Sequence, residues 1–545
     1  MGGIKMQTEQ NQFLSEGTKR IKGREAQRIN ILIGKAVAQA VRSTLGPKGM
    51  DKMIVDELGD VTISNDGATI LKEMAIDHPV GKMLVNLAKN QDSEVGDGTT
   101  TAVVIVGSLL EEAEILLDNG IHPSNIINGY RLAGEKAKDI YESISSKINS
   151  DKREDLHNIA LTALTGKAAE YCEKLADLSV NAILSVTEKN ENGKTIIDID
   201  NIKIEKKEGQ SLEDSELVKG IVLDKERVST NMPTLINNAK VALLDVALEI
   251  KGPETDTKVQ INSPDQLQAF IDQEETMIKE KVDIIKKSGA NVVFCQKGID
   301  DLAQHFLAKS NILACRRVKK SDLEKLAKAT GAEIVSRLKD LKANDLGTAK
   351  LVEEKKIAGE AMIFVRECKN PKAVTIFIRG GTEQVINEAE RAVNDGIGSV
   401  ASAIKSGKVV VGGGACETEV AMQLREYAKE IGGREQLAIE SFANALEVIP
   451  KTLAETAGMN PLDAIVALRN KHKKEGHEFG VDVLNAKIDD MKKAKVIEPL
   501  NLKTQAISSA NEVTQMILRI DDVIAGSSKG KGMPPGGMPD MGGMD

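Results

Sequence analysis

Residues 96–101 read GDGTTT and place an aspartate between two glycines, ahead of three threonines and an apolar run. Glycine lets backbone N–H groups approach an anion, and the helix expected to begin just after the turn adds unpaired N–H groups of its own. Asp97 would repel a phosphate unless a cation lay between them, and Mg²⁺ is typically held by one or two carboxylates together with phosphate oxygens. The motif therefore predicts a site for a metal-chelated polyphosphate.

Two other glycine-rich turns have the same character, LGPKG at 45–49 and GGGA at 412–415. Each by itself is equally consistent with an ordinary turn. The better-known phosphate motifs are missing from the sequence: GxxxxGK[ST] does not occur, and Thr101 stands where a dinucleotide fold has its third glycine. HExxH and CxxC are missing as well.

Two further carboxylates lie in NDG sequences, at 65–67 and 394–396. Asp66 is interpreted as a turn residue or a helix N-cap. An apolar stripe of helical spacing runs from 385 to 404, across the second NDG sequence, so a helix is expected to continue through Gly396 at a cost of about 1 kcal/mol relative to alanine. Asp395 falls off that stripe, and spacing alone favours a solvated surface charge over a chemical role.

The composition limits the class of protein. The 545 residues are too many for one core and predict two to four domains. Aromatic residues make up only 2%, and the net charge of −9 comes without a basic block, which argues against a nucleic-acid partner. The five cysteines are far apart, as expected of thiols in a reducing cytoplasm. No apolar stretch approaches 18 residues, so neither a membrane span nor a secretory leader is expected.

Periodicity predicts helical ends around an α/β centre. Helices are expected over about 24–44, after 67 and from 99 to about 119, with helical pattern continuing to about 147 and long helices again after 408. Strands are expected at 53–56 and 61–64, and β-rich runs alternate with helices between 190 and 375. A helix over 263–289 has Ser263 as its N-cap, with Gln266 completing a capping box.

The chain resembles the group II chaperonins, and most closely their archaeal members, relatives of the eukaryotic cytosolic chaperonin. The resemblance runs in order from about residue 18 to 526, and the Gly/Met-rich tail is also typical. It is carried by VRSTLGPKGMDKM, VTISNDGATIL, EVGDGTTTAVV, TALTGKAAE, RRVKKSD, VVVGGGACETE and IEPLNLKTQAI.

The resemblance implies a chaperonin fold of the multidomain α and α/β class. Its mostly helical equatorial domain would bind ATP, its small α/β intermediate domain would act as a hinge, and its α/β apical domain would bind substrate. The implied boundaries are 18–150 and 408–526 for the equatorial domain, 151–219 and 374–407 for the intermediate domain, and 220–373 for the apical domain. Residues 251–281 would form a helical lid protrusion, and 1–17 and 527–545 would be a flexible N-terminus and a disordered tail.

The implied function is that of an ATP-dependent chaperone, a subunit of a stacked double ring that encloses non-native client proteins and hydrolyses Mg-ATP. The alternative is a nucleotide-binding holdase or structural ring without productive turnover. A small-molecule kinase is a third hypothesis, which the lack of a recognisable second substrate site disfavours. The resemblance leaves open whether the ring contains this chain alone or paralogous subunits as well, and how many subunits it has.

The resemblance also implies a role for each matching residue. Asp66 and Asp395 would position and activate the attacking water, and Asp97 would bind Mg²⁺. The remaining residues would contact the nucleotide: Leu45, Gly46, Pro47 and Asn65 by packing on it, Gly98, Thr99, Thr100 and Thr101 at its phosphates, Thr165, Gly166 and Lys167 as a loop that senses the terminal phosphate, and Gly413, Gly414 and Glu498 on the ribose side. One departure is Gly396, where the family usually has alanine after the catalytic carboxylate.

Overall fold

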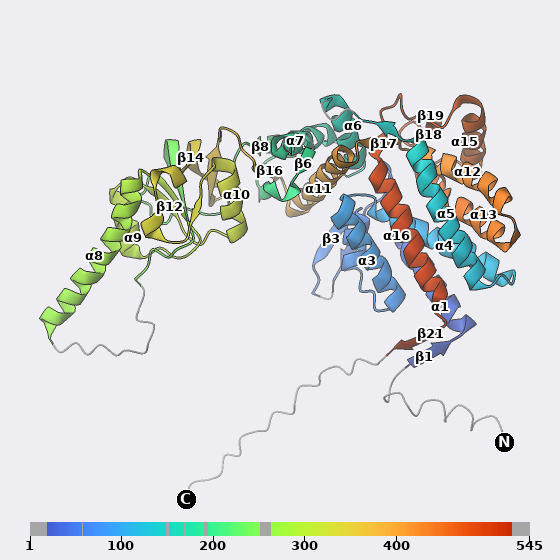
Figure 1. Cartoon of the computed structure of the whole chain (residues 1–545), viewed down its shortest axis with the longest axis horizontal. Coiled ribbons are helices and arrows are strands. Elements are labelled where there is room, and N and C mark those ends of the chain that lie inside the picture. Colours follow the sequence, from blue (N-terminus) through green and yellow to red (C-terminus); the bar gives the residue numbers. More distant parts are fainter. Residues whose placement is uncertain are drawn as a thin grey trace, which may run out of the picture.

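The structure is a computed structural model that describes residues 19–56, 58–148, 152–167, 171–189, 195–250 and 263–525. The molecule is elongated, and three groups of elements follow one another along its long axis (Figure 1). We call them the helical unit (19–148 and 408–525), the central unit (152–218 and 374–407) and the sheet unit (219–373). The multidomain α and α/β fold expected from the sequence is confirmed.

Both ends of the chain contribute helices to the helical unit. They are α1 (Arg24–Arg42), α2 (Gly67–Glu73), α3 (Pro79–Val95), α4 (Thr99–Asp118), α5 (Pro123–Ile144), α12 (Ala415–Ile431), α13 (Gly433–Leu446), α14 (Val448–Thr456), α15 (Pro461–Glu475) and α16 (Leu500–Arg519). Helix α4 packs against α1, α13 and α16, so the two halves share one hydrophobic core. Neither half of the chain can bury its apolar faces without the other.

Helix α4 begins with three threonines although their intrinsic helix propensity is low. All residues from Thr101 to Gly107 are buried, so tertiary packing of the β-branched side chains outweighs local preference. The helix ends where expected, with Gly120 in the left-handed conformation at φ 80°.

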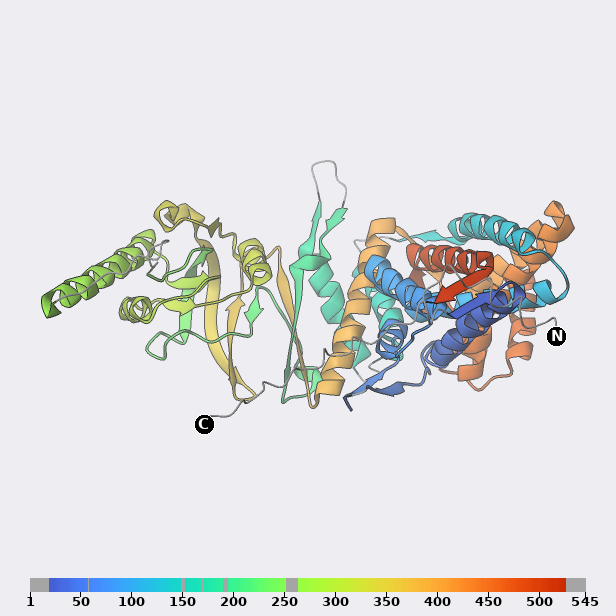
Figure 2. The same ribbon diagram turned by 90° about the horizontal axis from the view of Figure 1, so that it is seen from below.

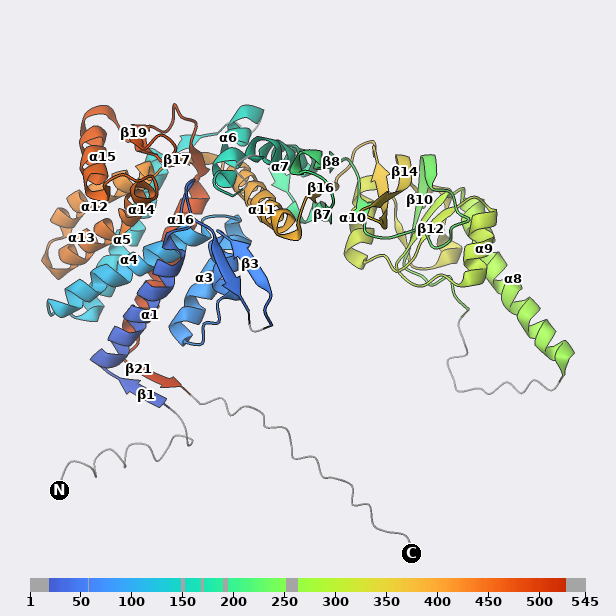
Figure 3. The same cartoon turned by 180° about the vertical axis from the view of Figure 1, so that it is seen from behind.

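Short strands join the helices of the helical unit. They are β1 (Lys19–Lys22) paired with β21 (Asp522–Ala525), the expected hairpin of β2 (Lys52–Val55) and β3 (Val61–Ser64), β18 (Phe479–Asp482) paired with β19 (Lys487–Asp490), and a small sheet in the order β20 (Ile497–Pro499), β17 (Lys408–Val411) and β4 (Ser146–Lys147). The hairpin and the terminal strand pair both project from the bundle (Figure 3).

Two expectations about the helical unit are corrected here. Helix α5 ends at Ile144 because the next residues pair with β17, and strands interrupt the helical pattern expected after 408.

The central unit packs three helices on a small sheet. The helices are α6 (Arg153–Leu164), α7 (Cys172–Val186) and α11 (Glu383–Ser406), and the sheet has the order β7 (Ile202–Glu208), β16 (Val374–Gly380) and β8 (Glu216–Val218). A second hairpin, β5 (Thr187–Lys189) with β6 (Thr195–Ile197), extends from the unit (Figure 2). Helix α11 runs through Gly396 without a break, as expected, because its apolar stripe is buried against α6 and α7.

The sheet unit is a twisted sheet with helices on both faces. Its strands are β9 (Val222–Leu223), β10 (Leu235–Leu244), β11 (Val292–Cys295), β12 (Leu313–Cys315), β13 (Ile334–Val335), β14 (Gly347–Ile357) and β15 (Glu360–Arg366), and the order is β12-β11-β10-β14-β15-β9 with β13 also on β10. Helix α10 (Lys320–Thr330) covers one face, and α8 (Pro264–Ser288) and α9 (Asp301–Lys309) cover the other.

Helix α8 projects from the sheet unit well beyond the sheet itself (Figure 1). Ser263 caps it by accepting a hydrogen bond from the Gln266 N–H at 3.3 Å, as expected. Its C-terminal half is buried through Ile278, Val282 and Ile285, whereas its N-terminal half is exposed. The expected lid segment 251–281 is described only from Ser263 onward.

Two other expectations concern the whole chain. All five cysteines are buried thiols. Among the described helices, none combines the length and apolar character that a membrane crossing requires.

Candidate active site

A cavity of about 740 Å³ lies where the helical and central units meet. It gathers most of the residues singled out from the sequence: Leu45, Gly46, Pro47, Asn65, Asp97, Gly98, Thr99, Thr100, Thr101, Thr165, Gly166, Lys167, Gly413, Gly414 and Glu498 line it. Asp66 and Asp395 do not line the cavity directly, but each contacts a residue that does. The three glycine-rich turns, far apart in the sequence, thus meet at one site.

The GDGTTT turn carries the first lining residues. Gly96 and Gly98 both have φ 79°, a conformation that favours glycine, and Asp97 Oδ1 accepts a hydrogen bond from the Gly98 N–H at 2.7 Å. Gly98 is the N-cap of α4 and offers no side chain to cap the helix. The first N–H groups of α4, at the cavity wall, are therefore available to an anion.

Asp66 is fixed by two hydrogen bonds at the start of α2. Its Oδ2 accepts from the Thr69 N–H at 2.8 Å, and its Oδ1 accepts from the Thr99 hydroxyl at 3.0 Å. Burial by itself would raise the pKa of Asp66, but the nearby Lys167 ammonium and these hydrogen bonds lower it below the ordinary value. Asp66 is therefore held ionised.

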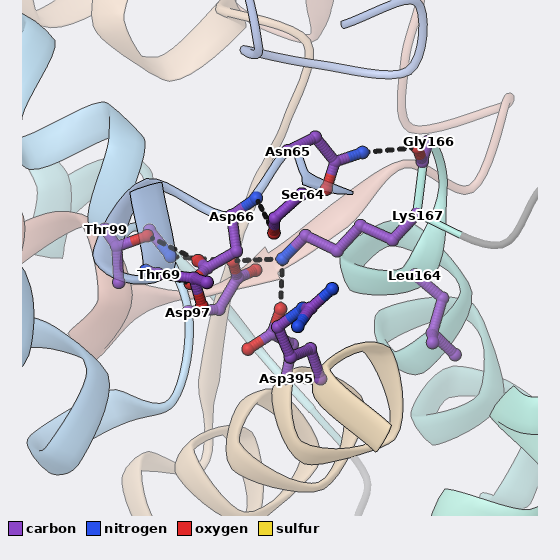
Figure 4. Close-up of polar contacts among 12 residues, drawn as sticks. Ser64, Asn65, Asp66, Thr69, Asp97, Thr99, Leu164, Gly166, Lys167 and Asp395 are labelled. Atoms are coloured by element: carbon purple, nitrogen blue, oxygen red, sulfur yellow. Dashed lines mark hydrogen bonds and ion pairs between the residues drawn. The ribbon is translucent and has the colours of Figure 1, made fainter. Parts of the chain in front are cut away.

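Lys167 points between three carboxylates (Figure 4). Its Nζ forms an ion pair with Asp395 and lies 3.6 Å from Asp97 Oδ1. Burial alone would lower the pKa of Lys167, but Asp395, Asp97 and Asp66 together raise it above its usual value. The lysine thus stays charged in a buried position.

The loop that carries Lys167 is tied to the helical unit. Asn65 Nδ2 donates to the Gly166 carbonyl at 2.8 Å. Gly166 has φ 98°, and a Cβ there would lie 3.0 Å from the carbonyl oxygen of Gly46. The TGK loop of the central unit therefore packs on the LGPKG turn of the helical unit.

Asp395 is buried, with 6% of its surface exposed, so the expectation of a solvated charge is wrong. The apolar stripe of α11 packs on α6 and α7, and the other side of the helix, which was expected to face solvent, meets the GDG turn. At that contact a Cβ on Gly398 would lie 2.7 Å from Gly96 Cα. Burial raises the pKa of Asp395, opposite to the shift at Asp66, while Lys167 favours its ionised form.

The sequence reasoning missed two residues at the Glu498 end of the cavity. Lys503 Nζ lies 2.7 Å from Glu498 Oε2 and 2.9 Å from Glu417 Oε1, and all three side chains are largely buried. Burial raises the pKa of Glu498, which the Lys503 ammonium counteracts. A signal existed in the sequence, because Glu417 and Lys503 belong to the GGGACETE and IEPLNLKTQ motifs. Their pairing was hidden, since the two residues lie on different helices.

A family model described as the TCP-1/cpn60 chaperonin family matches residues 37–528 of the chain. Several curated archaeal proteins are similar over nearly their whole length. A thermosome subunit from Pyrococcus horikoshii is 60% identical over 516 residues, 94% of each chain. One from Methanopyrus kandleri is 59% identical over 514 residues, again 94% of each chain. Thermosome subunit beta from Archaeoglobus fulgidus is 58% identical over 533 residues, 97% of this chain and 98% of the relative.

Proposed function

The chain belongs to the TCP-1/cpn60 chaperonin family and is an ATP-dependent chaperonin subunit with ATPase activity, and we propose that it hydrolyses Mg-ATP in the cavity between its helical and central units. One observation carries the assignment of the site. Asp66, Asp97 and Asp395 converge on one lysine at the wall of a cavity that also contains an uncapped helix N-terminus.

The donor set fits Mg²⁺ bound together with phosphate oxygens. The described residues contain no cluster of three or more histidine, cysteine or acidic side chains able to hold a metal on their own. Mg²⁺ keeps few protein ligands in phosphoryl-transfer sites and uses substrate oxygens for the rest. Asp97 is the residue assigned to it, and the ion would neutralise charge on the phosphates.

The chain's own groups divide the remaining work. The N–H groups of Thr99, Thr100 and Thr101 at the start of α4 bind phosphate, since an uncapped helix N-terminus favours anions. Leu45, Gly46, Pro47 and Asn65 pack on the nucleotide, Thr165 and Gly166 complete the loop beside its terminal phosphate, and Gly413, Gly414 and Glu498 lie along the ribose.

Two carboxylates with opposite pKa shifts suit the hydrolytic step. Asp395, whose pKa is raised by burial, accepts a proton from the attacking water, because a base works best when its pKa approaches the working pH. Asp66, held ionised, orients that water. Lys167 leaves Asp395 for the terminal phosphate when ATP is bound, which frees the base.

The same proposal divides the chain into functional domains. The helical unit corresponds to the equatorial ATP-binding domain (18–150 and 408–526), the central unit to the intermediate hinge domain (151–219 and 374–407), and the sheet unit to the apical substrate-binding domain (220–373). Support comes from the separate hydrophobic cores of the units. Asp395 belongs to the central unit, so hydrolysis depends on how that unit closes on the helical one.

The names of the relatives and the exposed apolar residues of the surface support proposals about the partners of the chain. Ring assembly is proposed because the relatives are named thermosome subunits, and because the β2–β3 hairpin exposes Met53, Val55 and Val61 as a surface for another subunit. The exposed half of α8 serves as the built-in lid over non-native client proteins. Buried thiols are consistent with a cytoplasmic location.

Phosphate release from the purified full-length chain tests the assignment of the site. The wild-type chain should release phosphate from ATP with Mg²⁺ and stop when the metal is chelated. Asp97→Ala should lose Mg-nucleotide affinity, whereas Asp395→Ala should still bind Mg-ADP and turn over roughly 10²–10⁴-fold more slowly. Near-normal turnover in Asp395→Ala would refute the site. A wild-type chain that binds nucleotide without turnover would be the holdase instead.

A further inference from the structure

Ser399 carries a buried hydroxyl at the proposed nucleotide cavity that forms no hydrogen bond with any described residue. The residue lies on α11, is 1% exposed and lines the cavity. Among the residues that the structure describes, its Oγ has no hydrogen-bond partner. A buried hydroxyl without a partner costs free energy, so such a group is normally satisfied by something that the protein itself does not supply.

The missing bond is unusual for a serine within a helix. Helical serines commonly donate to the carbonyl four residues earlier, and Ser179 on the neighbouring helix does so, to Leu175 O at 2.8 Å. The corresponding acceptor for Ser399 is the carbonyl of Asp395, which it does not use. Its hydroxyl is therefore left for a group inside the cavity.

The surroundings of Ser399 identify the end of the cavity at which it lies. Asp395 and Ser399 are one helical turn apart, about 6 Å along the same side of α11. Gly398, next to Ser399, packs on the GDG turn so closely that a Cβ there would lie 2.9 Å from Val95 O and 2.7 Å from Gly96 Cα. Ser399 thus lies on the helix that packs against this turn, one helical turn from Asp395, and lines the same cavity as Asp97.

We propose that the Ser399 hydroxyl donates a hydrogen bond to a phosphate oxygen of the bound nucleotide. A phosphate oxygen only accepts, and the Ser399 hydroxyl is a donor in the cavity wall that no described residue satisfies. The inference rests on the proposed function, because it takes the cavity to hold Mg-nucleotide. It adds a contact from the helix that carries Asp395, so that nucleotide binding itself pulls the central unit toward the helical unit.

The test compares Ser399→Ala and Ser399→Cys with the wild-type full-length chain, and Ser402→Ala serves as the matched control. Cysteine keeps the shape of serine, with a somewhat larger sulfur atom, but replaces its hydroxyl with a weak donor. Ser402 is a buried serine on the same helix that does not line this cavity. The readouts are the dissociation constant for Mg-ADP, from calorimetry, and the thermal midpoint with and without Mg-ADP.

Both Ser399 variants should bind Mg-ADP roughly tenfold more weakly, the size expected for losing one hydrogen bond to a charged group. Without nucleotide their thermal midpoints should equal or exceed the wild-type value, because a hydroxyl without a partner has been removed. Ser402→Ala should bind Mg-ADP as the wild type does.

Unchanged Mg-ADP affinity in Ser399→Ala would overturn the proposal, and so would a lower midpoint or failure to fold without nucleotide, since either would reveal a structural role. If the wild-type chain itself gained no stability from Mg-ADP, the proposed function would fail as well. If Mg-ADP stabilised the wild type and Ser399→Ala equally, the proposed function would stand and only the Ser399 contact would be rejected.

Discussion

The ammonium of Lys167 forms an ion pair with Asp395 and lies 3.6 Å from Asp97 Oδ1 (Figure 4). One side chain thereby neutralises both the proposed base and the proposed metal ligand. A terminal phosphate entering the cavity offers the lysine a stronger anionic partner. We therefore propose that Lys167 moves toward the terminal phosphate when nucleotide binds, which would release the Asp395 carboxylate from its ion pair.

Lys167→Ala should retain much of its affinity for Mg-ATP but respond less cooperatively to it. The reason is that the loop carrying Lys167 belongs to the central unit and loses its charge contact with the nucleotide. Initial rates of phosphate release against ATP concentration measure the Hill coefficient. The exposed Lys405 on α11 provides the control, since Lys405→Ala should behave as the wild type. An unaltered Hill coefficient in Lys167→Ala would mean that the lysine is not a sensor.

Asp66 has a structural and a chemical role that two substitutions separate. Asp66→Asn keeps an N-cap for α2, so its stability should stay near the wild-type value while phosphate release collapses. Asp66→Ala should lose the same activity and also about 0.5–2 kcal/mol of unfolding free energy, because the hydrogen bond from Thr69 disappears. Chemical denaturation and phosphate release measure the two effects. Full activity in Asp66→Asn would show that its charge is not needed.

The pH dependence of hydrolysis should report Asp395. Its pKa is raised by burial above the ordinary value of about 3.9, and a base acts only when ionised. Activity is therefore present above the Asp395 pKa and is lost as the pH falls through it. Because that pKa is raised, the loss should begin at a higher pH than an ordinary aspartate would give. Turnover at saturating Mg-ATP measures this, and the residual rate of Asp395→Ala should lack the acidic limb.

Periodicity could identify the long amphipathic helices, such as α1 and α11, because the apolar residues of each stripe recur at helical spacing within one continuous segment. The short strands β17 and β20 were missed because each is stabilised by pairing with a distant segment, which local pattern does not record. The burial of Asp395 was missed for the same kind of reason. Its cover is the GDG turn, about 300 residues earlier in the chain, so the spacing within α11 gave no sign of it.

The site contains one feature that the sequence could predict and one that it could not. Glycine, aspartate and threonine in GDGTTT predict a phosphate turn from chemistry alone, because backbone approach and charge are local properties. The pairing of Lys503 with Glu498 and Glu417 depends on how β20, α12 and α16 pack together, and only the fold reveals it.

Gly396→Ala tests the effect of glycine at the position after the proposed base Asp395, where the family usually has alanine. Alanine should gain about 1 kcal/mol of helix propensity, but its Cβ would lie 3.1 Å from Ser179 Oγ on α7. We expect the single substitution to change the unfolding free energy little, and the pair Gly396→Ala with Ser179→Ala to stabilise the chain beyond the sum of the two singles. A double-mutant cycle by chemical denaturation measures the coupling. Strict additivity would show that Ser179 does not restrict this position.

The exposed half of α8 can be tested without removing core residues. Leu267, Phe270 and Ile271 are 46%, 43% and 45% exposed, whereas Ile278 is completely buried. Replacing those three residues with serine should leave stability and phosphate release near the wild-type values but leave a bound client sensitive to protease under closing conditions. Ile278→Ala, as a contrast, should cost about 2–5 kcal/mol of stability. Protection of the client in the triple variant would refute a lid role.

The pairing of β1 with β21 joins the beginning and the end of the described chain, at Arg20 opposite Ile524 and Ile21 opposite Val523. On the ribosome, therefore, the N-terminal helices emerge first but must wait for the last helices before their shared core can close. The sheet unit, built from one continuous segment, can be complete in the meantime. Order of synthesis and order of folding are thus opposed for the N-terminal part. Each newly made subunit carries exposed apolar helices for most of its own translation, and during that interval it is vulnerable to aggregation.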